Sequence, residues 1–238
     1  MIAIRDISVT FGGVTALNKV TVDLADRVVG IIGPNGAGKT TFLNVLSGFV
    51  TPIAGSINAF GTELLAMPPH KRSRWGLRRS FQKEQVVDEL TVEDNIGVVL
   101  DSLPMAAKER QRHVAAALEF AGLSSLRRVR AGGLNAYQRR MTEIARCCAG
   151  QPRLLLLDEP GAGLSSHEVD HLRQAISSIH AFNGATVLLI DHDVDLIQAV
   201  CSSTMVLDFG SLVTSGPTRE VLSDPRVRAV YLGVEEFA

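Results

Sequence analysis

The chain has 238 residues, of which 46% are hydrophobic and 21% are charged, and its formal net charge at pH 7 is −1. This length suffices to bury one large core or two small ones, and the composition is that of an ordinary globular protein. The near-neutral charge disfavours a dedicated nucleic-acid binder, because such domains are usually basic. The longest apolar runs are far shorter than the roughly 20 residues that cross a bilayer, so we expect no membrane span.

Strand-like apolar runs alternate with helical patterns along the chain, which favours an α/β fold with a largely parallel sheet. The first two strands are expected around a turn at Gly12 and Gly13, and a helix is expected to follow the third strand from Thr40 onward. The expected strands are residues 2–10, 20–23, 27–32, 153–157, 185–190 and 204–207.

Residues 84–149 lack this alternation and are predicted to form an α-helical insert. Thr91 and the acids that follow it have the pattern of a helix start with a capping box. We therefore expect a single domain over residues 1–238. In it, residues 1–83 and 150–238 form the α/β core, and residues 84–149 form a helical subdomain.

Residues 33–40 match the pattern G-x-x-x-x-G-K-[ST] at every fixed position, between a predicted strand and a predicted helix. Glycines allow successive backbone N–H groups to turn inward and form an anion-binding nest at a helix N-terminus. Lys39 can reach the β- and γ-phosphates of a nucleotide, and the Thr40 hydroxyl can ligate Mg²⁺. The pattern predicts a site for Mg-ATP.

Two acids follow a run of four leucines at residues 154–157. Adjacent acids in a loop are usually only solvated charges, but α/β sheets place their ligands at the carboxyl ends of buried strands. Asp158 would hold Mg²⁺ directly or through water, and Glu159 would orient or deprotonate the attacking water.

Three motifs in this order resemble the nucleotide-binding subunits of ABC transporters, and the resemblance covers essentially the whole chain. They are GPNGAGKTT at residues 33–41, LLLLDEP at 154–160 and LLIDHD at 188–193. The resemblance implies a P-loop ATPase core with an N-terminal antiparallel β portion and an α-helical insert, and ATP and Mg²⁺ as cofactors. The nucleotide-binding residues that it implies are Gly33, Pro34, Asn35, Gly36, Ala37, Gly38, Lys39, Thr40, Thr41, Phe11 and Ala16.

The resemblance also assigns roles outside the phosphate loop. Phe11 corresponds to an aromatic residue that stacks on adenine, and Ala16 lines the same pocket. A core position at a strand end is the alternative for Phe11, because aromatic side chains commonly fill cores.

Three residues are implied to act in catalysis: Gln82, Glu159 and His192. Gln82 corresponds to a glutamine that contacts Mg²⁺ and the attacking water, and His192 to a histidine that contacts the γ-phosphate. The implied metal site consists of Thr40, Gln82 and Asp158. A structural role is the alternative for His192, as for any lone histidine.

The family's Leu-Ser-Gly-Gly-Gln loop, which caps the γ-phosphate of ATP bound to the opposite subunit, is altered in this chain. The corresponding residues are Leu134, Asn135, Ala136, Tyr137 and Gln138. Asn135 can still cap a helix and donate to phosphate. Ala136 and Tyr137 do not allow the backbone as close to phosphate as glycine does. We expect a weakened half-site for the partner's ATP, unless Tyr137 lies outside the contact.

Residues 11–18, 44–49 and 76–82 are most similar to ATPases of branched-chain amino-acid importers. We expect the energising subunit of such an importer, in the cytoplasm and peripheral on the inner face of the cell membrane. The expected partners are a second ABC ATPase subunit, in a homodimer or heterodimer, and integral-membrane permease subunits, without nucleic acid. The alternatives are an exporter ATPase of the lipopolysaccharide type and a soluble ABC-type ATPase acting on nucleic acid or ribosomes.

Two further patterns are interpreted as structural. His167 and His171 fit the zinc-protease pattern H-E-x-x-H, but they flank an apolar stripe at the expected solvated start of a helix. A basic run surrounds Trp75, and we expect it to be a solvated face. Its members are Lys71, Arg72, Arg74, Arg78 and Arg79.

Overall fold

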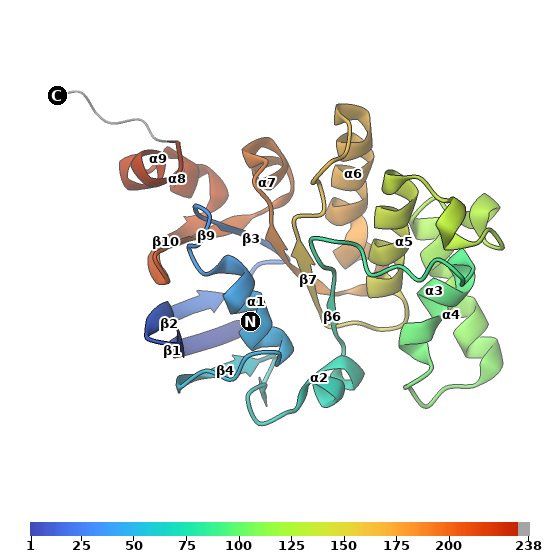
Figure 1. Cartoon of the computed structure of the whole chain (residues 1–238), viewed down its shortest axis with the longest axis horizontal. Coiled ribbons are helices and arrows are strands. Elements are labelled where there is room, and N and C mark those ends of the chain that lie inside the picture. The colour runs from blue at the N-terminus through green and yellow to red at the C-terminus, as the bar shows by residue number, and fades with distance from the viewer. Residues whose placement is uncertain (233–238) are drawn as a thin grey trace. The chain divides into compact units, whose positions relative to one another are not determined.

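The computed structural model describes residues 1–232 (Figure 1). These residues divide into two compact units. The first unit comprises Met1–Arg72 together with the chain from Leu188 onward, and the second comprises Ser73–Val187. The boundaries fall within helix α2 (Pro69–Trp75) and strand β8 (Thr186–Ile190). None of the helices within residues 1–232 combines the length and the apolar character that a membrane crossing requires.

The first unit contains an antiparallel sheet with the strand order β2–β1–β4–β5. Its strands are β1 (Ile2–Phe11), β2 (Val14–Leu24), β4 (Ala54–Ala59) and β5 (Thr62–Glu63). Phe11 pairs with Val14, so β1 and β2 form one long hairpin around Gly12 and Gly13. The predicted antiparallel portion is confirmed. Its second strand begins at Val14 rather than at residue 20, because the exposed polar side chains near its start hide the apolar alternation.

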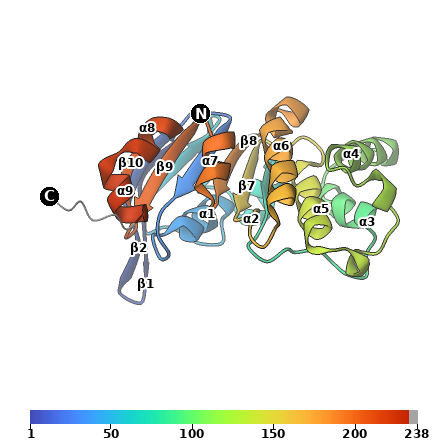
Figure 2. The ribbon, with the colours of Figure 1, turned by 90° about the horizontal axis from the view of Figure 1, so that it is seen from above.

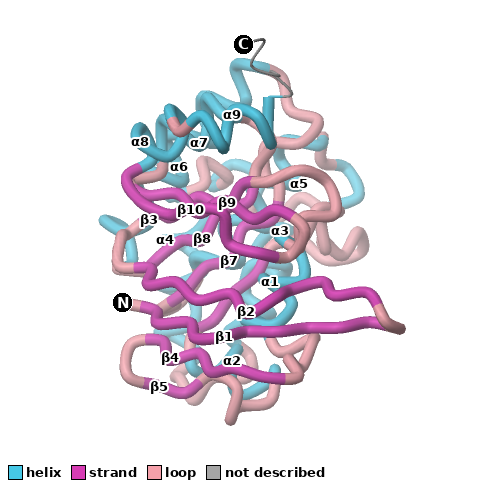
Figure 3. The backbone as a smooth tube through the Cα atoms, turned by 90° about the vertical axis from the view of Figure 1, so that its left-hand side faces the viewer, coloured by secondary structure: helices cyan, strands magenta, loops and turns pink. Residues whose placement is uncertain are grey.

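The other strands of the first unit are β3 (Val28–Ile32), β9 (Ser203–Asp208) and β10 (Ser211–Pro217). β3 is buried at every position and runs parallel to β9, which pairs antiparallel with β10. Figure 3 shows the antiparallel sheet on one side of these strands and three helices on the other side. These helices are α7 (Val194–Val200), α8 (Thr218–Ser223) and α9 (Pro225–Leu232). A strand buried on both faces is typical of a parallel α/β core.

The second unit combines the parallel strand pair β6 (Leu77–Arg79) and β7 (Leu154–Asp158) with helices. These are α3 (Val92–Gly97), α4 (Ala107–Phe120), α5 (Ala136–Cys148) and α6 (Ser166–Asn183). α3, α4 and α5 pack against one another, and α5 also contacts α6 and β6 (Figure 2). The predicted helical insert is therefore confirmed. α3 begins after Thr91 as expected, because the Thr91 hydroxyl accepts a hydrogen bond from the Asp94 N–H at 3.2 Å.

The basic run at residues 71–79 is not the solvated face that its composition suggests. Arg72 and Arg78 are 4% and 5% exposed, and the side chain of Arg79 is 5% exposed. Burial lowers the pKa of all three guanidinium groups, which nevertheless stay charged because arginine titrates far above neutral pH. The prediction was wrong for these residues because a run of charges does not reveal which members meet buried carbonyl groups.

Arg72 closes the C-terminal end of helix α1 (Lys39–Ser47), which follows the phosphate loop. Its Nη1 atom donates to the carbonyl oxygens of Val45 at 2.6 Å and Leu46 at 2.7 Å. Its Nε atom donates to the Met67 carbonyl at 2.8 Å. The last carbonyls of a helix have no intrahelical partner, so this buried cation both satisfies them and complements the helix dipole.

Replacing Arg72 with Met is expected to lower the free energy of unfolding by about 2–4 kcal/mol, because three carbonyls, two of them in buried hydrogen bonds, lose a charged donor. Urea unfolding followed by circular dichroism measures the change. Arg74→Met is the matched control, since Arg74 lies in the same helix and is exposed. Equal unfolding midpoints for the two variants would contradict the capping role.

Candidate active site

The phosphate loop joins the end of β3 to the start of α1, in the strand–loop–helix context predicted from the sequence. Gly38 is the N-cap of α1 and has a φ of 100°. A Cβ atom at this position would lie 2.6 Å from the Ala16 carbonyl oxygen, so β2 approaches the loop too closely for any other residue. No side chain caps α1 at Gly38. An anion in the loop would therefore be stabilised by the helix start itself.

Lys39 is folded back over this loop and is only 6% exposed. Its Nζ atom donates to the carbonyl oxygens of Gly33 at 2.6 Å and Pro34 at 2.9 Å. The ammonium group is thus held inside the loop by backbone dipoles. A polyphosphate bound there would meet a cation that is already in place, which lowers the reorganisation needed on binding.

Phe11 and Ala16, which are expected to contact the adenine base of the nucleotide, also belong to the first unit. Ala16 is half-buried and lies against Gly38 through its carbonyl oxygen. Phe11 ends β1 and is 51% exposed. The alternative reading of Phe11 as a core residue is therefore wrong, and its ring is accessible to a ligand.

Asp158 ends β7 and is 1% exposed. Its Oδ2 atom accepts a hydrogen bond from Arg79 Nη2 at 3.2 Å, and its backbone N–H donates to Ser80 Oγ at 3.1 Å. Burial lowers the pKa of the Arg79 guanidinium, while the neighbouring Asp158 charge opposes that shift. A buried carboxylate at a strand end is thus held in place from the adjacent strand β6.

Glu159 follows directly and is half-buried, with a φ of +50°. A non-glycine residue in the left-handed region of backbone conformation stores about 1–3 kcal/mol of strain, and such strain concentrates at functional sites. The Glu159 Oε1 atom accepts a hydrogen bond from Gln82 Nε2 at 2.9 Å. The structure therefore brings together two of the predicted catalytic residues, which are 77 positions apart in the chain.

Gln82 lies in a segment that we call the glutamine loop, residues 81–85, and α5 holds the backbone of this loop. Arg140 of α5 donates to the carbonyl oxygens of Phe81 and Gln82, each at 2.9 Å. Glu143 accepts from the N–H groups of Phe81 at 3.3 Å and Gln85 at 3.2 Å. Arg140 and Glu143 also form an ion pair at 2.8 Å, with side chains 1% and 0% exposed.

Burial raises the pKa of the Glu143 carboxyl, and the positive charge of Arg140 opposes that shift. Sequence reasoning assigned Arg79 to a solvated face and gave Arg140 and Glu143 no role. The signal for Arg140 and Glu143 was the spacing of opposite charges three positions apart on a predicted helix, which more often marks a solvent-exposed pair.

His192 is exposed in the short connection between β8 and α7. Its neighbours have structural roles. Asp193 accepts hydrogen bonds from the N–H groups of Asp195 and Leu196 and so caps α7. Asp191 is 5% exposed and accepts from the Asp193 N–H at 3.0 Å. The two acids therefore position the backbone on both sides of His192, whose own side chain is exposed.

The altered segment at residues 134–138 forms the start of α5. The Asn135 side chain accepts from the Gln138 N–H at 2.8 Å, and the Gln138 side chain accepts from the Asn135 N–H at 3.1 Å. This reciprocal capping box confirms that Asn135 caps a helix. It also engages both polar side chains of the segment with the helix itself.

Tyr137 is half-buried, and the centre of its ring lies 6.1 Å from that of His171 in α6. Burial, followed by the negative charge of Glu168, raises the pKa of the Tyr137 hydroxyl. His167 and His171 are both exposed, beside the buried Leu172 on the same helix. This arrangement agrees with the expected solvated start of a helix.

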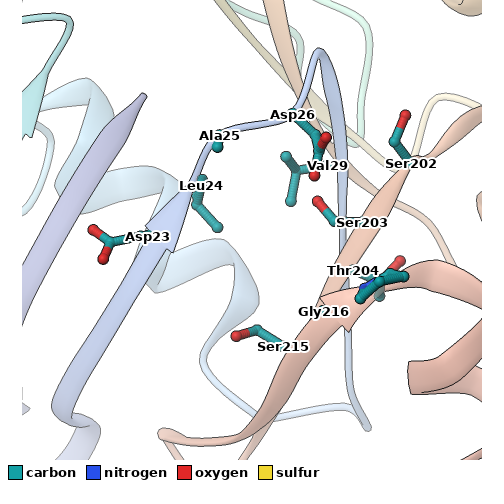
Figure 4. A pocket seen from close by; sticks show the side chains of 11 residues that line it. Asp23, Leu24, Ala25, Asp26, Val29, Ser202, Ser203, Thr204, Ser215 and Gly216 are labelled. Atoms are coloured by element: carbon teal, nitrogen blue, oxygen red, sulfur yellow. The ribbon is translucent and has the colours of Figure 1, made fainter.

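The predicted residues are thus divided between the two units. The first unit carries Phe11, Ala16, His192 and residues 33–41, and the second carries Gln82, Asp158, Glu159 and residues 134–138. A separate pocket of about 330 Å³ in the first unit lies near Asp26, Ser203 and Ser215 (Figure 4). None of the predicted site residues lines it.

A loop of glycines in left-handed conformations around a buried lysine, between a buried strand and a helix, defines a P-loop nucleotide-binding protein. The family model "ABC transporter" matches residues 17–162 of the chain. The chain belongs to this family and is an ATP-binding, ATP-hydrolysing protein.

Individual relatives and solved structures agree with this assignment. The branched-chain amino acid transport ATP-binding protein BraF of Pseudomonas aeruginosa is 34% identical over 98% of each chain. The lipopolysaccharide export system ATP-binding protein LptB of Acidithiobacillus ferridurans is 38% identical over 87% of this chain and 86% of its own. The ADP conformation of MJ1267, an ATP-binding cassette of an ABC transporter, has a TM-score of 0.86 at 29% identity. That match covers 98% of this chain and 99% of MJ1267.

Replacing Glu143 with Gln is expected to reduce the free energy of unfolding by about 3–5 kcal/mol, because Arg140 loses its buried partner and keeps only the more distant carboxylate of Glu84, at 3.7 Å. Urea unfolding measures the loss. The double variant Arg140→Met with Glu143→Met removes both charges and should recover part of the stability. A double variant no more stable than Glu143→Gln alone would argue against a coupled buried pair.

Proposed function

We propose that this chain is the ATP-hydrolysing subunit that energises a membrane importer of branched-chain or related amino acids. The relatives BraF of Pseudomonas aeruginosa and LivG of Escherichia coli, both named as branched-chain amino acid transport ATP-binding proteins, support it. Each aligns with 98% of this chain and 98% of its own length. The observation that carries the hydrolytic part is the hydrogen bond between Gln82 and the strained Glu159.

Binding of ATP rests on the phosphate loop in this proposal. Lys39 and the backbone N–H groups of residues 33–41 hold the β- and γ-phosphates. Mg²⁺ would be held by the hydroxyl of Thr40, the carboxylate of Asp158 and the amide oxygen of Gln82, all of which are oxygen atoms, the ligand type that Mg²⁺ prefers. Bound Mg²⁺ supplies charge neutralisation on the phosphate oxygens.

Hydrolysis in this proposal is attack of water on the γ-phosphate, with Glu159 orienting or deprotonating the water. Gln82 donates its amide N–H to Glu159, so the direction of the carboxylate depends on the glutamine loop. His192 contacts the γ-phosphate and stabilises the charge of the transition state. Catalysis of phosphoryl transfer is mostly positioning and charge stabilisation, which suits a site without a covalent nucleophile.

Because the segment at residues 134–138 faces a partner's nucleotide in this proposal, two ATPase subunits would pair. Each ATP then lies between residues 33–41 of one subunit and residues 134–138 of the other. Integral-membrane permease subunits would carry the substrate, with this chain peripheral on the cytoplasmic face of the membrane.

A second candidate function is the ATPase of a lipopolysaccharide exporter. The 38% identity to LptB is higher than the 34% to BraF, although it extends over less of both chains. Co-purification of the membrane partners distinguishes the importer from the exporter. The importer function predicts that permease subunits for amino acids co-purify with this chain.

Replacing Glu159 with Gln is expected to lower ATP hydrolysis by about 10²–10⁴-fold, the range of a general base, while ATP binding is retained. Phosphate release and the dissociation constant of ATP are measured on the full chain. Lys39→Ala is the contrasting variant, in which binding itself should be lost. Wild-type turnover by Glu159→Gln would exclude Glu159 as the residue that activates water.

Replacing Tyr137 with Gly is expected to raise ATP turnover about tenfold, the effect of regaining one charge-assisted backbone hydrogen bond to phosphate. Steady-state turnover of the purified protein measures it, with Tyr137→Phe as the control that keeps the ring. An unchanged rate in Tyr137→Gly would mean that the aromatic side chain does not weaken the half-site.

A further inference from the structure

The turn between β9 and β10 presents an aromatic side chain to solvent. Phe209 and Gly210 are its two central residues, with φ values of 42° and 77°, and Asp208 pairs with Ser211 across it. Positive φ at both centres is the type I′ geometry, for which Asn-Gly is the favoured pair. Phe209 is 86% exposed, so its ring gains almost no packing energy. Local turn preference and burial therefore both fail to account for a phenylalanine here.

The same residue pair in the same conformation occurs once more in the first unit. Phe60 and Gly61 connect β4 to β5 with φ values of 51° and 83°. A Cβ atom at Gly61 would meet nothing within 4 Å, whereas one at Gly210 would lie 2.7 Å from the Ala16 carbonyl oxygen. The turn at Phe209 thus packs closely against β2 at Gly210, whereas the space around Gly61 in the other turn is open.

The backbone of Gly210 ties this turn to both parts of the candidate nucleotide site in the first unit. The Gly210 N–H donates to the Ala37 carbonyl of the phosphate loop at 3.1 Å. The Gly210 carbonyl accepts from the Asn18 N–H of β2 at 2.8 Å. Figure 3 shows the β9–β10 turn beside the β1–β2 hairpin that carries Ala16. Phe209 is therefore held one residue from a point where the phosphate loop and β2 meet.

We propose that Phe209 is a specificity residue that contacts the base of a nucleotide whose phosphates lie in the loop at residues 33–40. The inference rests on the proposed nucleotide site. A base attached to those phosphates must extend beyond the loop, and β2 at Ala16 is the side on which the base is expected. An exposed aromatic ring fixed at that junction offers a stacking surface, which any planar base can use.

The test compares Phe209→Asn with the matched control Phe60→Asn. Asparagine is the preferred residue at this turn position and the Phe209 ring is 86% exposed, so Phe209→Asn should not lower the melting temperature of the ligand-free protein. Phe209→Asn is expected to weaken ATP binding by about tenfold, the scale of losing one base–aromatic stack. Binding of inorganic tripolyphosphate, which has no base, should be unchanged. Phe60→Asn should leave both affinities as in the wild type.

Three results would overturn the inference, and they are distinguishable. Wild-type ATP affinity in Phe209→Asn would exclude a contact with the base. An equal loss for ATP and tripolyphosphate would show that the turn acts on the phosphate loop instead. A wild-type protein that binds neither ligand would refute the proposed nucleotide site itself. Recovery of ATP affinity in Phe209→Trp, which restores an aromatic surface, would support the stacking contact.

Discussion

The buried ion pair between Arg140 and Glu143 is the contact on which the catalytic half of the second unit depends. Two charges out of water are tolerated only when good geometry and further hydrogen bonds compensate for their desolvation. Here the compensation comes from the backbone of the glutamine loop, which supplies two carbonyls and two N–H groups. The loop therefore cannot move away from α5 without leaving a charge or a polar group unpaired in the interior.

This coupling has a mechanistic consequence within the second unit. The start of α5 is the segment at residues 134–138, its middle binds the glutamine loop, and Gln82 of that loop is hydrogen bonded to Glu159. In the proposed function, a partner's nucleotide touching the start of α5 would be connected to the catalytic carboxylate through one rigid helix and one buried ion pair. The reciprocal bonds of Asn135 and Gln138 make the start of that helix well defined, even though the glycines of the family's motif are absent.

Buried arginine side chains stabilise both units. Arg72 satisfies the last carbonyls of α1, and Arg79 pairs with the buried Asp158. Arginine suits such positions because its planar group has five donors and keeps its charge when buried. The near-neutral net charge of the chain thus conceals cations in the interior, and one of them, Arg79, contacts the proposed metal ligand Asp158.

The sequence by itself determined the phosphate loop, the α/β class, the helical insert and the positions of Asp158 and Glu159 at a strand end. These features depend on residue types within short contiguous segments, where glycine conformation and apolar periodicity act locally. Only the tertiary structure decided that Arg72, Arg79, Arg140 and Glu143 are buried, that Gln82 meets Glu159, and that Phe209 stands beside the phosphate loop. Each of these depends on contacts between residues far apart in the chain. The exposure of each of these side chains is set by the groups that the fold brings next to it. Local sequence does not encode which groups those are.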